Sequence, residues 1–485
     1  MKLQKSLTLA IAPLLALGLF LLMSSNGINP NVAKMAGLAL WIAIWWLTEA
    51  VHLAVTSLLP IIFLPILGIA DSKTTAQQYM DPIIFLFIGG FIIAFAIEKW
   101  ELHKRIAYKI LQIVGVSTSR ILFGIMLTSF LLSMWISNTA TVMMLISAVI
   151  AIILQVENLF SEEKHSHNFS TAVLIGLAYS ATIGGMATLV GTPTNMIFYR
   201  EYVEKYSGQG DLNFFTWFAI GFPIALLFLI VTFFILKRLF LKNSKFEHLP
   251  EHHFGKMYQN LGKMSFEEIV ISIIFLSTAV LWFTRADIDF GIIKLYGWNN
   301  FFAKKEFLQD STVAIAMAVL LFIIPAKSKP NSAILVWDDV KKLPFGIILL
   351  FGGGFALAKG FELSGLTIWL GSQLQFVAGA NIYLVILLLC VLITIISEFA
   401  SNVACIQLML PILIAMQHTM GVNPLMLMIP ATLASSLGFM LPVATAPNTI
   451  VYGSGKIKTK DMLKAGLLID IVGIIIISLF SFLIK

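Results

Sequence analysis

Two short polar islands inside long apolar stretches carry the side chains that could bind a ligand, Ser137-Asn138-Thr139 and Ser401-Asn402-Val403. They lie 264 positions apart (401 − 137), and a second polar break follows each, at Gly191-Thr192-Pro193-Thr194-Asn195 and at Ala444-Thr445-Ala446-Pro447-Asn448. The four segments contain no Lys, Arg or His, so they offer hydroxyls, amides and backbone groups. Free N–H groups at half-helix ends suit an anion, and oxygens without a carboxylate cluster suit Na⁺ better than Ca²⁺ or a transition metal.

The elements that hold these segments are predicted to be membrane helices. Hydrophobic residues make up 59% of the 485 residues, charged residues only 12%, and the mean hydropathy is +0.92, which is far more apolar than a soluble domain. The apolar runs do not alternate in polarity, so they indicate helices rather than barrel strands. We expect an all-α integral membrane protein with about eleven transmembrane helices, near 7–23, 35–48, 53–70, 82–97, 171–190, 214–236, 269–283, 311–325, 345–358, 424–443 and 463–484.

The net charge of +7 comes from basic residues in the loops. A membrane protein uses such residues for orientation, so no nucleic-acid partner is expected. Most of the 32 Lys and Arg fall on the cytoplasmic side if the N-terminus is cytoplasmic and the two island-bearing stretches do not cross the bilayer. The pattern predicts a multi-pass protein of the inner (plasma) membrane, with its C-terminus on the outer side.

Each island is predicted to form the tip of a re-entrant helical hairpin, over 121–155 and 381–417. The flanks of the first island would be about 24 Å long if fully helical, which is short for a crossing. Gly and Pro in the second breaks predict broken helices over 171–206 and 424–455. Ordinary kinks are the alternative for any single motif. Four motifs in two ordered pairs favour a binding site, because backbone groups exposed at membrane depth must line a cavity or bind something.

The same offset of 264 residues also aligns Gly89-Gly90-Phe91 with Gly353-Gly354-Phe355. An odd number of predicted crossings separates the two islands, so the repeat is inverted, as in many secondary transporters whose substrate site lies near the midplane. The predicted organisation is an N-terminal helix (1–30), a first inverted repeat (31–242), a cytoplasmic linker (243–264) and a second inverted repeat (265–485).

Glu398 departs from the repeat, since its partner is Met134 (398 − 264). An acid inside a membrane segment is a functional candidate. It could tune ion coupling, carry a proton or make a structural hydrogen bond, and the sequence does not choose among these roles. The sequence shows no nucleophile–base pair and no metal cluster, so an enzyme is not expected.

These features resemble the divalent anion/sodium symporter family, which includes INDY-type dicarboxylate and tricarboxylate transporters and some sulfate transporters. The resemblance covers nearly the whole chain and rests on the two islands, the two later breaks, and Thr48-Glu49-Ala50 with Val55-Thr56 upstream. It implies a homodimer whose protomers each have a fixed scaffold and a transport domain that moves as an elevator. The transport domain would comprise about 121–242 and 380–485, with the scaffold formed by the remainder.

The resemblance also implies site residues. One Na⁺ site would use Ser133, Ser137, Asn138 and carbonyls near Gly191, and the other would use Ser397, Asn402 and carbonyls near Ala444 and Ala446. Substrate carboxylates would meet Asn138, Thr139 and Asn402, with Thr194, Thr445 and Pro447 close by. Val403 stands in the substrate site where some family members have a hydroxyl, which could shift preference among anions.

The expected function is Na⁺-coupled uptake of a small divalent anion, a C4-dicarboxylate such as succinate, with at least two Na⁺ per cycle. A dicarboxylate exchanger that ignores Na⁺ is the nearest alternative. Sulfate or tricarboxylate transport on the same fold is another. An anion channel is the alternative from a different class.

Overall fold

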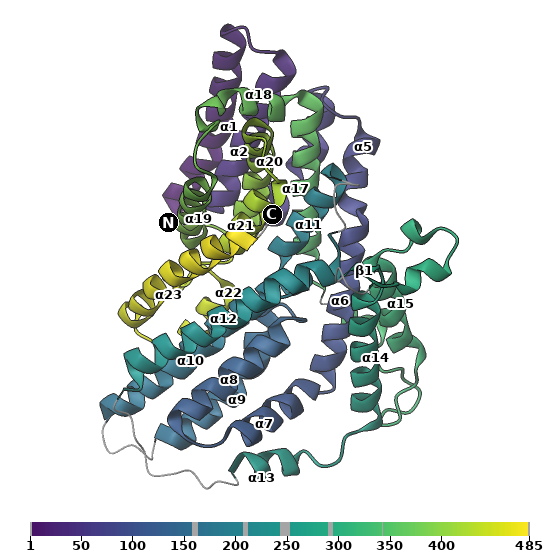
Figure 1. Cartoon of the computed structure of the whole chain (residues 1–485), viewed down its shortest axis with the longest axis vertical. Coiled ribbons are helices and arrows are strands. Elements are labelled where there is room, and N and C mark those ends of the chain that lie inside the picture. Colours follow the sequence, from purple (N-terminus) through teal and green to yellow (C-terminus); the bar gives the residue numbers. More distant parts are fainter. Residues whose placement is uncertain are drawn as a thin grey trace.

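The computed structural model describes residues 2–157, 163–206, 212–242, 253–289, 294–341 and 343–483. These residues are almost all helical, as predicted, with one small antiparallel hairpin of β1 (Ile288–Asp289) and β2 (Lys294–Leu295). The predicted linker 243–264 lies partly outside the described residues, and α13 occupies part of the rest. Figure 1 shows an elongated bundle in which the colours of the two sequence halves interleave.

The helices of the first half are α1 (Lys2–Ser25), α2 (Pro30–Thr48), α3 (Leu53–Thr56), α4 (Leu59–Ile66), α5 (Ser72–Gln77), α6 (Pro82–Lys99), α7 (Leu102–Val114), α8 (Thr118–Ser133), α9 (Asn138–Glu157), α10 (Glu163–Met186), α11 (Pro193–Lys205) and α12 (Phe214–Phe240). Those of the second half are α13 (His253–Asn260), α14 (Phe266–Phe283), α15 (Asp310–Ile323), α16 (Trp337–Val340), α17 (Phe345–Ser364), α18 (Leu366–Gln373), α19 (Ile382–Phe399), α20 (Asn402–Met420), α21 (Pro424–Ala434), α22 (Ala446–Tyr452) and α23 (Thr459–Phe480). Short 3₁₀ turns are η1 (Gln78–Met80), η2 (Trp298–Phe301), η3 (Lys305–Phe307), η4 (Gln375–Val377) and η5 (Ser481–Leu483).

The described residues contain 11 helices long and apolar enough to cross a membrane, which matches the predicted number but not the predicted set. The expected spans at 53–70, 311–325 and 424–443 contain only shorter helices, because each is interrupted or stops early. Three hairpin limbs, α9, α19 and α20, are long enough instead. The length argument for re-entry concerned the two flanks of the first island. It was wrong for α9, which begins at Asn138 itself and runs for 20 residues, whereas α8 has only 16 residues.

Both hairpins are nevertheless present, because the chain reverses at each island. In the first, α8 runs parallel to α10, with Ser129 Oγ donating to the Leu177 carbonyl at 2.8 Å. The following helix α9 runs back along α10, so that its last residue, Glu157, accepts from Ser170 Oγ at 2.7 Å. In the second, Cys405 of α20 lies against the Ile393 carbonyl of α19. Figure 1 shows α8, α9 and α10 packed side by side.

The proline of each later break begins a helix. Pro193 is the first residue of α11, and Pro447 lies in the first turn of α22. Proline is tolerated there because the first helical turn has no intrahelical N–H bond to lose. The chain is therefore unwound between α10 and α11 and again between α21 and α22. All of the most apolar window of α10 is buried, so it forms the core around which the first hairpin packs.

Candidate functional site

The two hairpin tips meet in one cavity of about 780 Å³. Its wall includes the island residues Ser137, Asn138, Thr139, Ser401, Asn402 and Val403, and the break residues Thr192, Pro193, Ala444, Thr445, Ala446 and Pro447. Residues 264 positions apart in sequence thus face the same space. The volume is in the range of small-ligand sites. The cavity opens at the molecular surface, where Val443 is 78% exposed.

A serine behind each tip holds the asparagine of that tip. Ser133 Oγ donates to Asn138 Oδ1 at 2.7 Å, and Ser397 Oγ donates to Asn402 Oδ1 at 2.8 Å. Both serines are fully buried at the ends of α8 and α19. Because each serine hydroxyl donates a hydrogen bond to the amide oxygen, it fixes which edge of the asparagine side chain can turn toward a ligand. Ser397 Oγ also lies 2.6 Å from the Ser435 carbonyl.

A second pair of asparagines clamps the unwound segments in the same way in both halves. Asn195 Nδ2 donates to the carbonyls of Gly185, at 3.0 Å, and Thr188, at 2.7 Å, which lie 10 and 7 residues earlier. Asn448 Nδ2 donates to the carbonyls of Gly438, at 3.0 Å, and Leu441, at 3.1 Å, again 10 and 7 residues earlier. The amide oxygens of both asparagines are buried without a hydrogen-bond partner among the described residues. The inverted repeat therefore extends to individual hydrogen bonds.

Glycine is required where the first break closes on itself. A Cβ added at Gly191 would lie 2.6 Å from the Gly185 carbonyl oxygen, which no real side chain tolerates. The close approach brings the unwound backbone against α10. Its carbonyl groups can then be presented near Asn138, which itself lies against Gly185.

The structure brings together most, but not all, of the predicted site residues. Nine of them line the cavity: Ser137, Asn138, Thr139, Asn402, Val403, Ala444, Thr445, Ala446 and Pro447. Ser133 and Ser397 lie directly behind the tips, and Gly191 lies against Gly185. Thr194 does not line the cavity, because it is fully buried with its hydroxyl 3.2 Å from Ser436 Oγ. The roles assigned to these residues stay predictions.

The opposite wall of the cavity comes from residues that we did not predict as part of the site. The lining residues of this wall are Phe91, Phe95 and Glu98 of α6, Ile347 of α17, and Glu49. Glu49 caps the C-terminal end of α2 in the left-handed conformation, with a φ of 47°. The sequence signal that could have identified this wall was the repeated Gly-Gly-Phe motif, which includes Phe91. No Lys, Arg or His lines the cavity in the described part of the chain. The described residues also hold no cluster of three His, Cys, Asp or Glu that could bind a metal.

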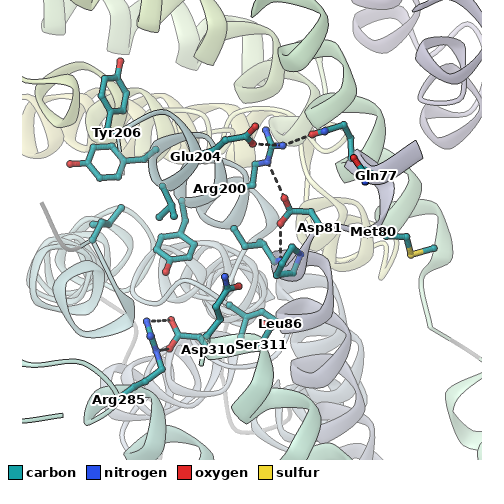
Figure 2. A pocket seen from close by; sticks show the side chains of 18 residues that line it. Gln77, Met80, Asp81, Leu86, Arg200, Glu204, Tyr206, Arg285, Asp310 and Ser311 are labelled. Atoms are coloured by element: carbon teal, nitrogen blue, oxygen red, sulfur yellow. Dashed lines mark hydrogen bonds and ion pairs between the residues drawn. The ribbon is translucent and has the colours of Figure 1, made fainter. Parts of the chain in front are cut away.

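A second cavity of about 830 Å³ lies at the other end of α6 and is organised by arginines (Figure 2). Arg200 of α11 pairs with Asp81 at 3.2 Å and with Glu201 at 2.8 Å, and it also contacts Gln78 and Glu204. Its side chain is only 5% exposed. Arg285 pairs with Asp310 on the neighbouring wall. The acids that line this space already neutralise both guanidinium groups.

Known proteins are similar to this chain over nearly its whole length. The family described as the sodium:sulfate symporter transmembrane region matches residues 3–484. The chain is 38% identical over 477 residues to the sodium-dependent dicarboxylate transporter SdcS of Staphylococcus saprophyticus, covering 97% of this chain and 89% of that one. It is 37% identical over 481 residues to SdcS of Staphylococcus aureus, with the same coverage. Among solved structures, MtrF of Neisseria gonorrhoeae matches with a TM-score of 0.59 at 11% identity, over 90% of this chain and 96% of that one. The last match shows the fold alone.

Proposed function

The chain belongs to the sodium:sulfate symporter family, and on this premise we propose that it is a secondary transporter that couples Na⁺ to the uptake of a C4-dicarboxylate such as succinate. The observation that carries the proposal is the single cavity into which both hairpin tips project. The two relatives named as sodium-dependent dicarboxylate transporters support the choice of substrate. The protein acts as a carrier in a membrane and not as an enzyme.

The substrate is proposed to bridge the two tips. Asn138 and Asn402 are the first residues of α9 and α20, so each tip offers an amide side chain and the free N–H groups of a long helix to one carboxylate. A C4-dicarboxylate has a carboxylate at each end and suits such a pair of anion sites. Among the described residues, those that line the cavity include no Lys, Arg or His that would supply a fixed cation. The charge of the dianion is therefore offset by bound Na⁺.

The Na⁺ ions are proposed to lie behind the tips, one in each half. The oxygens available in the first half are those of Ser133, Ser137, Asn138 and the carbonyls of the break near Gly191. The second half offers Ser397, Asn402 and the carbonyls near Ala444 and Ala446. Neutral oxygen donors of this kind suit a small hard cation. Two such ions balance a dianion, and any further ion would make transport sensitive to the membrane potential.

Movement is proposed to occur between a scaffold and a transport domain comprising about 121–242 and 380–485. Several ion pairs cross this boundary along α11: Arg200 binds Asp81 at 3.2 Å, Lys205 binds Glu362 at 3.2 Å, and Glu204 lies 3.8 Å from Lys359. An elevator motion must break all of these pairs, so they are proposed to hold the state seen in the structure. The homodimer implied by the family resemblance stays a prediction.

The orientation proposed from the loop charges makes this state inward-facing. The substrate cavity lies toward the C-terminal end of α6, beside Glu98 and the basic residue Lys99, whereas Asp81 and Arg200 lie at its N-terminal end. If Lys99 is cytoplasmic, the cavity opens to the cytoplasm and the Arg200 network closes the outer side. The N-terminus would then be cytoplasmic and the C-terminus on the outer side.

The decisive experiment is uptake of labelled succinate into proteoliposomes that contain the purified protein. We expect uptake with an inward Na⁺ gradient and none when choline replaces Na⁺. Uptake that ignores Na⁺ but needs internal dicarboxylate would instead identify an exchanger. Stronger competition by unlabelled sulfate or citrate than by succinate would reassign the substrate. Flux far above carrier rates would identify a channel.

A further inference from the structure

The second unwound segment is held by a buried carboxylate that the proposed binding of Na⁺ and substrate does not use. Glu398, at the end of α19, has no exposed surface. Its Oε1 accepts from the Met440 N–H at 2.8 Å, and its Oε2 accepts from the Leu441 N–H at 3.0 Å. Both N–H groups belong to the segment between α21 and α22. Because a buried amide without an acceptor is costly, this carboxylate fixes the path of the segment.

A second carboxyl group backs the first. Asp470 of α23 is 2% exposed, faces Glu398, and has no other side-chain partner for either oxygen among the described residues. The hydroxyl of Tyr179 of α10 donates to the Phe439 carbonyl and lies 3.3 Å from the Met462 carbonyl. α23 can approach the segment so closely because Gly466 has no side chain. A Cβ at this position would collide with the Phe439 carbonyl. Three helices, α10, α19 and α23, thus converge on the segment that includes Phe439 to Leu441.

No basic side chain among the described residues pairs with this carboxylate. In the described part of the chain, neither Glu398 nor Asp470 forms an ion pair with a Lys, Arg or His side chain. The two backbone N–H groups of the unwound segment are therefore the hydrogen-bond partners that the Glu398 carboxylate has there.

The described residues of the first half place no pair of carboxyl groups behind the first break. The repeat partner of Glu398 is Met134, and there the Thr188 hydroxyl donates to the Met134 carbonyl. The same hydroxyl oxygen accepts from the Gly191 N–H at 3.1 Å. A hydroxyl group therefore holds the first break, whereas a carboxyl group holds the second. The acid in the second half cannot be explained by the repeat alone.

We propose that Glu398, backed by Asp470, is the positioning residue for the cation site in the second half. The link is short, because the Leu441 carbonyl accepts from the Ala444 N–H at 3.2 Å and from Asn448 Nδ2 at 3.1 Å. Glu398 therefore sets the segment that presents the carbonyls near Ala444. The inference rests on the proposed Na⁺ coupling and assigns Glu398 no direct contact with Na⁺ or substrate.

The test is Glu398→Gln, in which an amide nitrogen replaces one acceptor and can serve only one of the two N–H groups. We expect the Na⁺ concentration for half-maximal uptake to rise roughly tenfold, with the succinate half-saturation at saturating Na⁺ nearly unchanged. Na⁺ should also stabilise the purified variant against thermal unfolding in the absence of substrate. The Na⁺ concentration that gives half of this stabilisation should rise by the same factor. Asp470→Asn should stay close to the original protein, because an amide of the same size and shape can donate a hydrogen bond to Glu398.

Glu267→Gln is the matched control. Glu267 of α14 is also fully buried and also accepts a backbone N–H, from Ser328 at 2.7 Å, but it lies outside the proposed transport domain. It should lower thermal stability without changing the Na⁺ dependence. If Glu398→Gln does not fold, Asp470→Leu, which removes only the carboxyl group behind Glu398, should raise the Na⁺ requirement in the same direction.

The inference is overturned if Glu398→Gln keeps the original Na⁺ dependence, or if Glu267→Gln changes that dependence equally. It is also overturned if the succinate and Na⁺ half-saturations rise together, since that would indicate general damage. A failure of the proposed function looks different, because the unaltered protein would then show no Na⁺-dependent uptake. In that case, thermal stabilisation by Na⁺ alone still measures the affinity of the cation site.

Discussion

The two halves of the protein agree where they face the cavity and differ where they are held from behind. Each half presents an asparagine fixed by a buried serine, at 2.7 Å in the first half and 2.8 Å in the second. Each also clamps its unwound segment with an asparagine that reaches back 10 and 7 residues. Behind the segments, neutral groups serve the first half and the Glu398–Asp470 pair serves the second.

The ionic contacts of the halves differ as well. The first broken helix continues as α11, which has 13 residues and carries Arg200 and Lys205 to acids of the proposed scaffold. The second continues only as the seven-residue α22, and the nearby Lys456 pairs with Glu157 at 2.7 Å, inside the proposed transport domain. The repeat therefore preserves the groups that meet ligands and varies the groups that decide what each half is attached to.

The largest expected effect comes from removing the shared asparagines. Asn138→Ala and Asn402→Ala should each lower the initial rate of succinate uptake by more than about 100-fold, because each loses its contact with both the anion and a cation. Proteoliposome uptake measures the loss, and unchanged thermal unfolding without ligands shows that folding is intact. If one variant kept normal uptake and Na⁺ dependence, the two tips would not be equivalent.

The next effect separates the serines. Ser133→Ala and Ser397→Ala should each raise the Na⁺ half-saturation concentration about fivefold, since each asparagine loses the hydroxyl that orients it. The increase should be larger for Ser397, which also lies against the Ser435 carbonyl. Ser129→Ala is the control, because Ser129 is buried in the same helix but bonds Leu177. A Na⁺ dependence equally altered in the control would argue against a cation site behind the tips.

A smaller effect is expected from the ionic contacts. Asp81→Asn weakens the pair with Arg200 but keeps the side-chain oxygen that caps α6. The ratio of inward-open to outward-open molecules should fall about fivefold, which corresponds to about 1 kcal/mol. Labelling of a single cysteine at Thr48, compared from the two sides of the membrane, measures that ratio.

Lys456→Gln breaks a pair that does not cross the proposed boundary, so it should leave the ratio unchanged. Equal shifts in the two variants would show that the boundary between the moving and fixed parts lies elsewhere.

The smallest effect concerns the one side-chain difference between the tips. Val403→Thr adds the hydroxyl that Thr139 has in the first half, and it should change the ratio of succinate to sulfate half-saturation about threefold. Thr139→Val should move the ratio in the opposite direction. Competition uptake with both anions measures the change. An unchanged ratio in both variants would remove position 403 from the determinants of specificity.

The sequence predicted the residues that recur and missed those that act through distant partners. The offset of 264 identified both tips and both breaks, and the structure places nine of the predicted site residues on one cavity wall. The partners of Glu398 could not be found in this way. Asp470 lies far along the chain and has no repeat partner of its type, and backbone N–H groups leave no mark in a sequence.

Element lengths were the other weak point. The apolar flanks stop at the polar islands, but α9 and α20 begin with the island residues Asn138 and Asn402. Counting apolar residues therefore made α9 look shorter than its 20 residues, whereas α8 has 16 residues. The network around Arg200 was not predicted, because the sequence alone does not indicate the packing that buries this guanidinium group.

The contact made by Tyr179 has a consequence for biogenesis. This side chain belongs to the first repeat, yet its hydroxyl donates to carbonyls of Phe439 and Met462 in the second. The first repeat therefore leaves the ribosome with a phenol whose carbonyl acceptors have not yet been synthesised. The hydrogen bond of Tyr179 can therefore form only after the second half has been synthesised. Expressing the two repeats as separate chains should succeed only when both are present in the same membrane.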